Sequence, residues 1–188
     1  TLPDGMALSE LALSIDDKPL ADGDVTALRV VEDDRLVQLG DTAREALSAL
    51  SARLARDDPD VLVVSHSAVV PLLYEVAEDL GLASHGRGGY GAPVDDGGFR
   101  LGRRAGYRIL AGDNTVVSYG QVGYSPARYD VPGRALIDTS NSFLWYKTGL
   151  DGILYFVEQA RRPVQEVAWG SIGTILTAIQ TRKARERG

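Results

Sequence analysis

The segment PDVLVVS, at residues 59–65, constrains the fold of this chain more than any other stretch, because four consecutive apolar residues stand between short polar ends. In a strand, successive side chains point to opposite faces of the sheet. A short, valine-rich run without alternating polar residues is therefore typical of a strand whose sheet is covered on both faces. We therefore predict a central strand here, and we expect it to pair in parallel with the first strand of the chain.

Three shorter β-rich runs come first in the chain and are separated by the turn sequences DDKPLADGD and EDD. Their spacing predicts an antiparallel meander of three strands. Two helices are predicted around the central strand, the first with Thr42 and Glu45 in a capping-box spacing and an apolar stripe through Leu47 and Leu54. The predicted ranges are 10–15, 25–31 and 35–39 for the meander, 41–56 for the first helix and 67–80 for the second.

The second half of the chain is less regular. Residues 84–98 are rich in glycine and predict a loop, and a hairpin is expected in which residues 107–110 pair with 115–119 across the sequence AGDN. A strand at 134–137 ends in Asp138. Two helices follow, one over 150–160 and a single final helix after Pro163, whose expected inward face consists of Val167, Ile172, Ile175, Leu176 and Ile179.

Composition limits the class of protein. The 188 residues and their 44% hydrophobic content suit one domain, 1–188, with parts at 8–82, 83–132 and 133–188. The chain has no cysteine, which excludes disulfides and thiolate metal sites. It has no apolar run long enough to span a membrane, and its start lacks the features of a signal peptide, so we expect a cytoplasmic protein.

Charge is distributed unevenly along the chain. The net charge is −6, but residues 133–188 carry 8 basic and 5 acidic groups, so the last third is basic. An acid-rich, lysine-poor surface elsewhere suits a halophilic protein, in which acidic side chains keep the surface hydrated. The basic last third is the part expected to meet a phosphate ligand.

Three antiparallel strands, a helix, a central parallel strand, a helix and a last strand with C-terminal helices follow the order of a ribonuclease H-like fold. The expected architecture is α/β, of the 3'-5' exonuclease type, with a mixed five-stranded sheet flanked by helices and an extra β-hairpin. In that fold carboxylates at strand ends and on a late helix converge on two metal ions. The candidates here are Asp16, Asp17, Asp138 and Asp151, with Asp16 and Asp17 as the metal ligands.

Three segments carry a resemblance to a known family: PDVLVVSHSAVVPLL, VPGRALIDTSNSF and RRPVQEVAWGSIGTILTAIQTRKARERG. They resemble the exonuclease region of archaeal family B DNA polymerases, including the shorter forms found in salt-loving archaea. The resemblance covers most of residues 8–188. It implies a piece of a longer polymerase acting in DNA replication or repair, with DNA and the palm and N-terminal domains of the same chain as partners.

The metal-binding motifs of that family are altered here. Ser14 takes the place of the first aspartate, Asp16 the place of a glutamate, and Ala68 and Val69 the place of a Phe-Asp pair. Tyr146 and Asp151 stand one residue too far apart for the third motif. The resemblance thus implies a degenerate site with no cofactor, whereas an active site would require Mg²⁺.

Nucleic-acid contacts are expected in the basic last third. Arginine and lysine side chains bind phosphates without regard to sequence, and exposed aromatic rings stack on single-stranded bases. The alternatives are a solvated helix end for the charges and a core position for the rings. The candidates are Arg161, Arg162, Arg182, Lys183 and Arg185, with Trp145 and Tyr146 beside Phe143.

Three functions therefore stay open. The first is a non-catalytic, exonuclease-like domain of a polymerase that positions DNA. The second is an active two-metal 3'-5' proofreading exonuclease, which requires the carboxylates to assemble around shared metal ions. The third is a stand-alone nucleic-acid or protein interaction module on a ribonuclease H-like fold.

Overall fold

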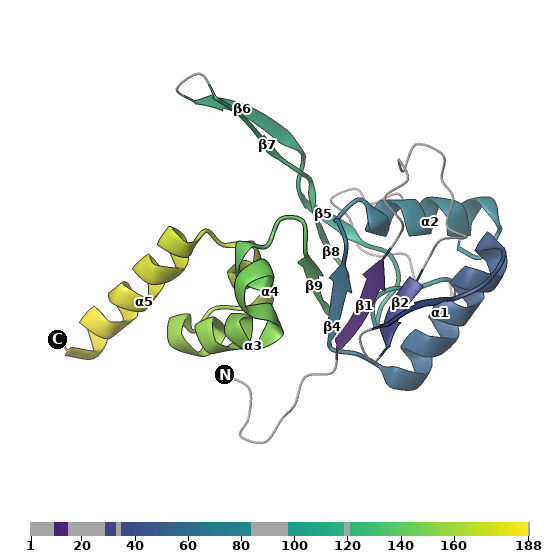
Figure 1. The fold of residues 1–188 in the computed structure, drawn as a ribbon, viewed down its shortest axis with the longest axis horizontal. Coiled ribbons are helices and arrows are strands. Elements are labelled where there is room, and N and C mark those ends of the chain that lie inside the picture. Colours follow the sequence, from purple (N-terminus) through teal and green to yellow (C-terminus); the bar gives the residue numbers. More distant parts are fainter. Residues whose placement is uncertain (1–9, 15–28, 33–34, 84–97, 119–120, 188) are drawn as a thin grey trace. The chain divides into compact units, whose positions relative to one another are not determined.

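The chain is a mixed α/β protein in which all the described strands precede three C-terminal helices (Figure 1). We describe it from a computed structural model. No helix in the described part of the chain is long and apolar enough to cross a membrane. The described residues are 10–14, 29–32, 35–83, 98–118 and 121–187.

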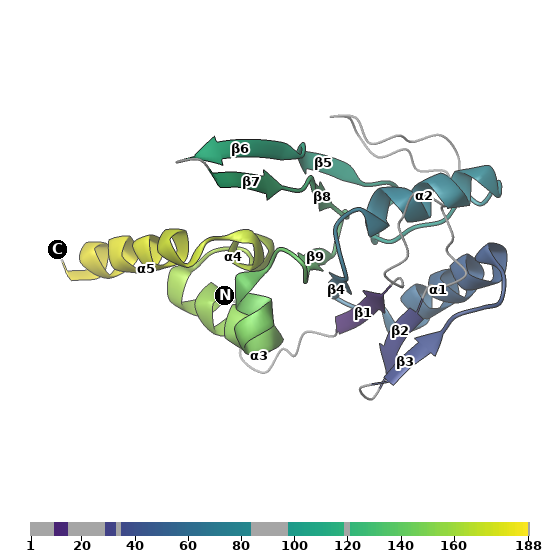
Figure 2. The same ribbon diagram turned by 45° about the horizontal axis from the view of Figure 1, so that its top comes forward.

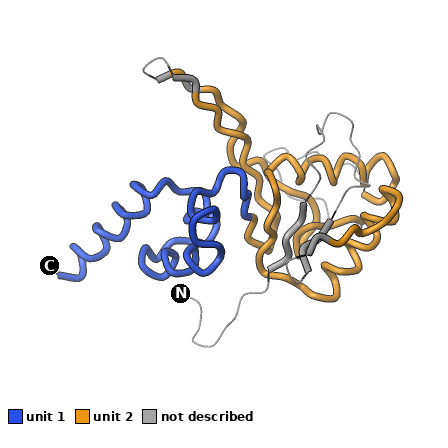
Figure 3. The backbone as a smooth tube through the Cα atoms, in the orientation of Figure 1, with its two compact units in different colours: residues 1–8, 137–188 blue, residues 9–136 orange. Residues whose placement is uncertain are grey.

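The chain separates into two compact units (Figure 3). Unit 2 comprises residues 9–136 and contains most of the strands and the first two helices. Unit 1 comprises residues 1–8 and 137–188 and contains the last three helices. The boundary between the units falls inside strand β9, Ala135–Asp138.

The main sheet has the hydrogen-bonded strand order β3-β2-β1-β4-β9. β1 runs antiparallel to β2, and β2 runs antiparallel to β3, which confirms the predicted meander. β1 and β4 run parallel, with Leu11 opposite Leu62, so the predicted pairing of the central strand is also confirmed. The strands are β1 Glu10–Ser14, β2 Arg29–Glu32, β3 Arg35–Gln38 and β4 Val61–Val64.

Strand β4 is buried on both faces, as its apolar sequence predicts. Successive strand residues point to opposite faces of a sheet, and each β4 side chain is at most 3% exposed. Leu62 and Val64 belong to the core cluster that also includes buried side chains of α1 and α2. Figure 2 shows these two helices next to each other beside the strands of the main sheet. These helices span Ala43–Asp57 and Val69–Asp79, respectively.

Helix α1 begins with the capping box that its sequence predicts. The Thr42 Oγ1 accepts a hydrogen bond from the Glu45 N–H at 3.2 Å, and the Glu45 carboxylate accepts one from the Thr42 N–H at 3.1 Å. Two backbone donors that the first helical turn leaves without intrahelical partners are thereby satisfied.

Replacing Thr42 with alanine is expected to lower the free energy of unfolding by about 1 kcal/mol, because the substitution removes one acceptor of the box. Urea titration followed by far-UV circular dichroism measures the change. Thr42→Ser keeps the hydroxyl and should stay near the wild type. A serine variant as unstable as the alanine variant would show that the methyl group, and not the cap, stabilises this end of the helix.

The predicted hairpin between residues 107–110 and 115–119 is wrong. β5 (Arg108–Ala111) pairs with β8 (Arg128–Asp130), and β6 (Asn114–Ser118) pairs with β7 (Gln121–Ser125). The strands meet partners further along the chain because AGDN carries the chain onward from β5 into β6 instead of reversing it (Figure 1). Residues 84–97 of the predicted glycine-rich loop lie outside the described residues.

A buried arginine of unit 2 links the end of α1 and the turn after it to residue 101. Arg134 is 8% exposed, and its guanidinium donates hydrogen bonds to the carbonyl oxygens of Leu101, Pro59 and Leu54. Its Nη1 also lies 3.0 Å from Asp58 Oδ1. Burial lowers the pKa of Arg134 below its ordinary value, and the carboxylate opposes this shift.

An exposed arginine extends the same network. Arg103 donates hydrogen bonds to the carboxylates of Asp58 and Asp60 and to the Gly133 carbonyl oxygen. The hydrogen bonds from Arg103 hold the pKa of Asp58 below its usual range. Arg103 and Arg134 therefore contact the same turn after α1, one from the surface and one from the interior.

Unit 1 contains three helices, and their boundaries differ from the predicted ones. The predicted helix over 150–160 is the second part of α3, which begins at Phe143 and is interrupted at Gly149. The single final helix predicted after Pro163 is two helices, because Gly170 adopts an extended backbone with φ −69° and ψ 142°. The helices are α3 Phe143–Ala160, α4 Val164–Trp169 and α5 Ile172–Arg187.

The inward face expected for the final helix is only partly correct. Val167 and Ile175 are buried, at 1% and 5% exposure. Ile172 and Leu176 are 38% and 46% exposed, so the structure places them at the surface. Because the helix breaks at Gly170, α4 and α5 have different axes. The buried face of α5 therefore cannot be extrapolated from the helical spacing of α4.

Candidate nucleic-acid interface

The last turn of α3 places two arginines at the start of the candidate site. Arg161 ends the helix in the left-handed conformation, with φ 51° and ψ 48°. Pro163 then stands at the N-cap of α4, where it needs no hydrogen bond from its nitrogen. The chain thus changes direction sharply at Arg161 and Arg162.

The junction between α4 and α5 is tightly packed around Gly170. A side chain at Gly170 would place its Cβ 3.0 Å from the Glu166 carbonyl oxygen and 3.2 Å from Ile175 Cγ1. Ser171 caps the start of α5: its hydroxyl oxygen accepts a hydrogen bond from the Thr174 N–H at 3.2 Å. Glycine followed by serine therefore ends one helix and starts the next within two residues.

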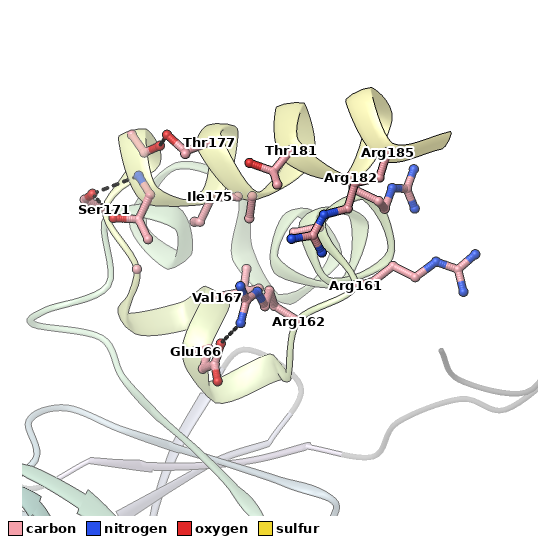
Figure 4. A pocket seen from close by; sticks show the side chains of 15 residues that line it. Arg161, Arg162, Glu166, Val167, Ser171, Ile175, Thr177, Thr181, Arg182 and Arg185 are labelled. Carbon is pink, nitrogen blue, oxygen red and sulfur yellow. Dashed lines mark hydrogen bonds and ion pairs between the residues drawn. The ribbon is translucent and has the colours of Figure 1, made fainter. Parts of the chain in front are cut away.

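A cleft of about 930 Å³ lies within unit 1, between the end of α3, α4 and α5 (Figure 4). Three buried apolar side chains line it, and the remaining lining residues are mostly cationic or hydroxyl-bearing. The apolar residues are Ala160, Val167 and Ile175, the cationic ones are Arg161, Arg162, Arg182 and Arg185, and the hydroxyl-bearing ones are Ser171, Thr174, Thr177 and Thr181.

The cleft carries more positive charge than its own acidic group can balance. Glu166 is the acidic residue among the lining residues, and it lies 3.5 Å from Arg162. Arg182 Nε lies 3.5 Å from Glu186. Arg161 and Arg185 form no ion pair with any acidic residue in the described part of the chain. Two guanidinium groups are thus available to an anionic ligand.

Figure 4 shows Arg161, Arg182 and Arg185 toward the C-terminal end of α5, where Arg182 also donates a hydrogen bond to the Glu158 carbonyl oxygen at 3.4 Å. That contact ties α5 to α3. Lys183, the remaining predicted cation, is exposed and does not line the cleft. Four of the five predicted basic residues therefore meet in one site.

Aromatic side chains of α3 are more exposed than a core position allows. Tyr146 is 79% exposed and Phe143 is 54% exposed, whereas Trp145 is partly buried. The alternative that this cluster fills the core is therefore wrong for Tyr146 and Phe143. Among the predicted aromatic candidates, Tyr146 is available for contact with a ligand over most of its surface.

The described carboxylates do not assemble into a metal centre. Asp138 is 3% exposed, and it accepts hydrogen bonds from the Ser140 hydroxyl at 2.6 Å and the Asn141 amide at 2.9 Å. Asp151 is exposed on α3. Within the described residues no group of three or more potential metal-ligating side chains occurs. Asp16 and Asp17 lie outside those residues, so their prediction as metal ligands stays untested.

Several residues that line the cleft were not predicted from the sequence. The hydroxyl groups of Ser171, Thr174, Thr177 and Thr181 recur at intervals of three and four residues, which is the spacing of one helical face. That signal was visible in the sequence. Lys147 does not line the cleft; its ammonium lies over the exposed Tyr146 ring.

The fold and the cleft define this chain as a mixed α/β protein with an arginine-lined site in its C-terminal helices. Comparison with known protein families finds no family model that matches the chain, and comparison with curated proteins finds no significant match. Its function is therefore proposed from topology, charge and exposed chemistry.

Proposed function

We propose that this chain is a catalytically degenerate, exonuclease-like domain of a family B DNA polymerase and that it positions DNA. The observation that carries the proposal is the strand order β3-β2-β1-β4 in unit 2, with β1 antiparallel to β2 and parallel to β4. A helix connects β3 to β4, and another follows β4. This is the order expected for a ribonuclease H-like fold.

The altered motifs support the loss of catalysis. β1 ends at Ser14, the position at which the resemblance expects an aspartate. The first turn of α2 contains no acidic residue, and Val69 stands at its start. Hydrolysis by two metal ions requires several carboxylates around the ions, and neither a serine nor a valine replaces an aspartate in that role.

The cleft of unit 1 supports the DNA-binding part of the proposal. The cleft arginines provide donors for phosphate oxygens, and two of them, Arg161 and Arg185, form no ion pair within the described part of the chain. Contacts to phosphate oxygens carry no sequence information. Such a site holds a strand in place without selecting its sequence. This property suits a domain that positions DNA within a longer polymerase chain.

The test measures the shortening of 5'-labelled single-stranded DNA by the 188-residue chain with Mg²⁺ or Mn²⁺, at low and high salt, alongside its binding to the same DNA. We expect binding that weakens with salt and no shortening. Shortening that disappears in an Asp16→Ala/Asp17→Ala variant would establish the active exonuclease instead. A folded chain that neither binds nor shortens DNA would refute the proposal.

A further inference from the structure

The first turn of α3 holds two aromatic rings outward. Ser142 caps this helix by accepting a hydrogen bond from the Trp145 N–H at 3.2 Å, and the Leu144 side chain is buried at 2% exposure. The cap and the buried leucine fix the orientation of the turn. Phe143 and Tyr146, which are three residues apart and share one face of the helix, are left 54% and 79% exposed.

The ammonium group of one lysine lies over both rings. Lys147 Nζ is 4.9 Å from the centroid of the Tyr146 ring and 6.0 Å from that of Phe143. Tyr146 and Lys147 follow Phe143 by three and four residues, respectively. This spacing places both side chains next to Phe143 on the helix surface. The surface formed by Phe143, Tyr146 and Lys147, which we call the aromatic platform, therefore combines two π-faces with one positive charge.

Unpaired nucleotides match this combination of groups. An unstacked base offers a flat face for an aromatic ring, and the adjoining phosphate offers a negative charge for the ammonium. In a duplex the base faces are stacked on one another and cannot reach a ring on a protein surface. The segment that carries the platform, residues 133–188, is also basic, with 8 basic and 5 acidic groups.

We propose that the aromatic platform stacks on the bases of single-stranded DNA and gives the chain a preference for single strands over duplex. This inference rests on the proposed DNA-binding function and specifies its substrate class. The arginines of the cleft supply affinity for any phosphate backbone, whereas the rings of Phe143 and Tyr146 discriminate between the two forms of DNA.

The test compares the affinity of the full chain for a labelled oligothymidylate and for a duplex of the same length, by fluorescence anisotropy. Tyr146→Ala is expected to weaken single-strand binding about fivefold or more, since removing a ring that stacks on a base typically costs that much or more. Duplex binding should change less than about twofold. Tyr146→Phe keeps the ring and should bind both forms like the wild type.

Tyr155→Ala is the matched control, because Tyr155 is a 58% exposed ring on the same helix that packs edge-on against Phe156. It should leave both affinities unchanged. Equal losses for single strands and duplex in Tyr146→Ala would overturn the inference, as would no loss in that variant while substitutions at the cleft arginines weaken binding. A wild-type chain that binds neither form would refute the proposed function as well.

Discussion

Replacing Arg134 with alanine is expected to lower the free energy of unfolding by about 3–5 kcal/mol, because it removes the donor of buried carbonyl oxygens, at about 1–3 kcal/mol each, and the packing of a long buried side chain. The Arg134 side chain is 4% exposed, and its guanidinium donates to three backbone carbonyl oxygens. The substitution leaves the Leu101 and Pro59 carbonyl oxygens, which belong to buried residues, without this donor, whereas the Leu54 oxygen keeps its hydrogen bond from the Asp58 N–H. Denaturant titration followed by far-UV circular dichroism measures the loss.

Arg103→Ala is the matched control for this prediction. Arg103 contacts the same Asp58 carboxylate, but its side chain is 39% exposed, so water replaces much of what is lost. We expect a loss of about 1 kcal/mol or less. Equal losses in both variants would mean that the ion pair with Asp58, and not the buried carbonyl oxygens, accounts for the stability.

Tryptophan fluorescence is not a suitable probe of unfolding in unit 2, because both tryptophans, Trp145 and Trp169, lie in unit 1.

The double substitution Arg161→Ala/Arg185→Ala is expected to weaken binding to single-stranded DNA of every sequence. Both arginines line the cleft and have no ion pair within the described part of the chain. Each phosphate contact on a single strand adds about 0.7 to the slope of log affinity against log salt concentration, so the slope should fall by about 1.4. Affinities measured at several salt concentrations give this slope.

Arg162→Ala provides the comparison, because Arg162 lines the same cleft but already lies 3.5 Å from Glu166. Its guanidinium is partly neutralised, and its removal should change the slope less than removal of either unpaired arginine. A slope unchanged in the double variant would show that DNA phosphates do not enter the cleft. A loss restricted to some sequences would show that the site reads bases instead.

Local sequence patterns predicted the elements that depend on them. The apolar run at 61–64 forms a strand buried on both faces, because a run this short and this rich in valine favours a strand over a buried helix. Thr42 and Glu45 form the predicted capping box, since both partners lie within one helical turn. In the cleft, the basic residues were predicted as phosphate contacts from their position in a basic segment.

Pairings between distant residues were not predictable in the same way. The strands of residues 107–125 were assigned to the nearest partner across AGDN, but the structure pairs β5 with β8, 17 residues beyond its end. Strand pairing depends on which partner completes the ladder, and two short β-rich runs carry no information about that choice. The start of α3 was missed because Gly149 interrupts the helical pattern after only six residues.

The sequence by itself determined the mixed α/β class, the buried central strand, the first helix and the basic character of the C-terminal segment. Each of these follows from periodicity, capping or composition within a few residues. Only the tertiary structure decided that Arg161, Arg162, Arg182 and Arg185 line one cleft and that Tyr146 faces solvent. The first outcome depends on how α3, α4 and α5 pack, which the break at Gly170 between α4 and α5 influences. The second depends on the burial of Leu144, which orients the first turn of α3. Neither kind of packing can be derived from a local sequence pattern.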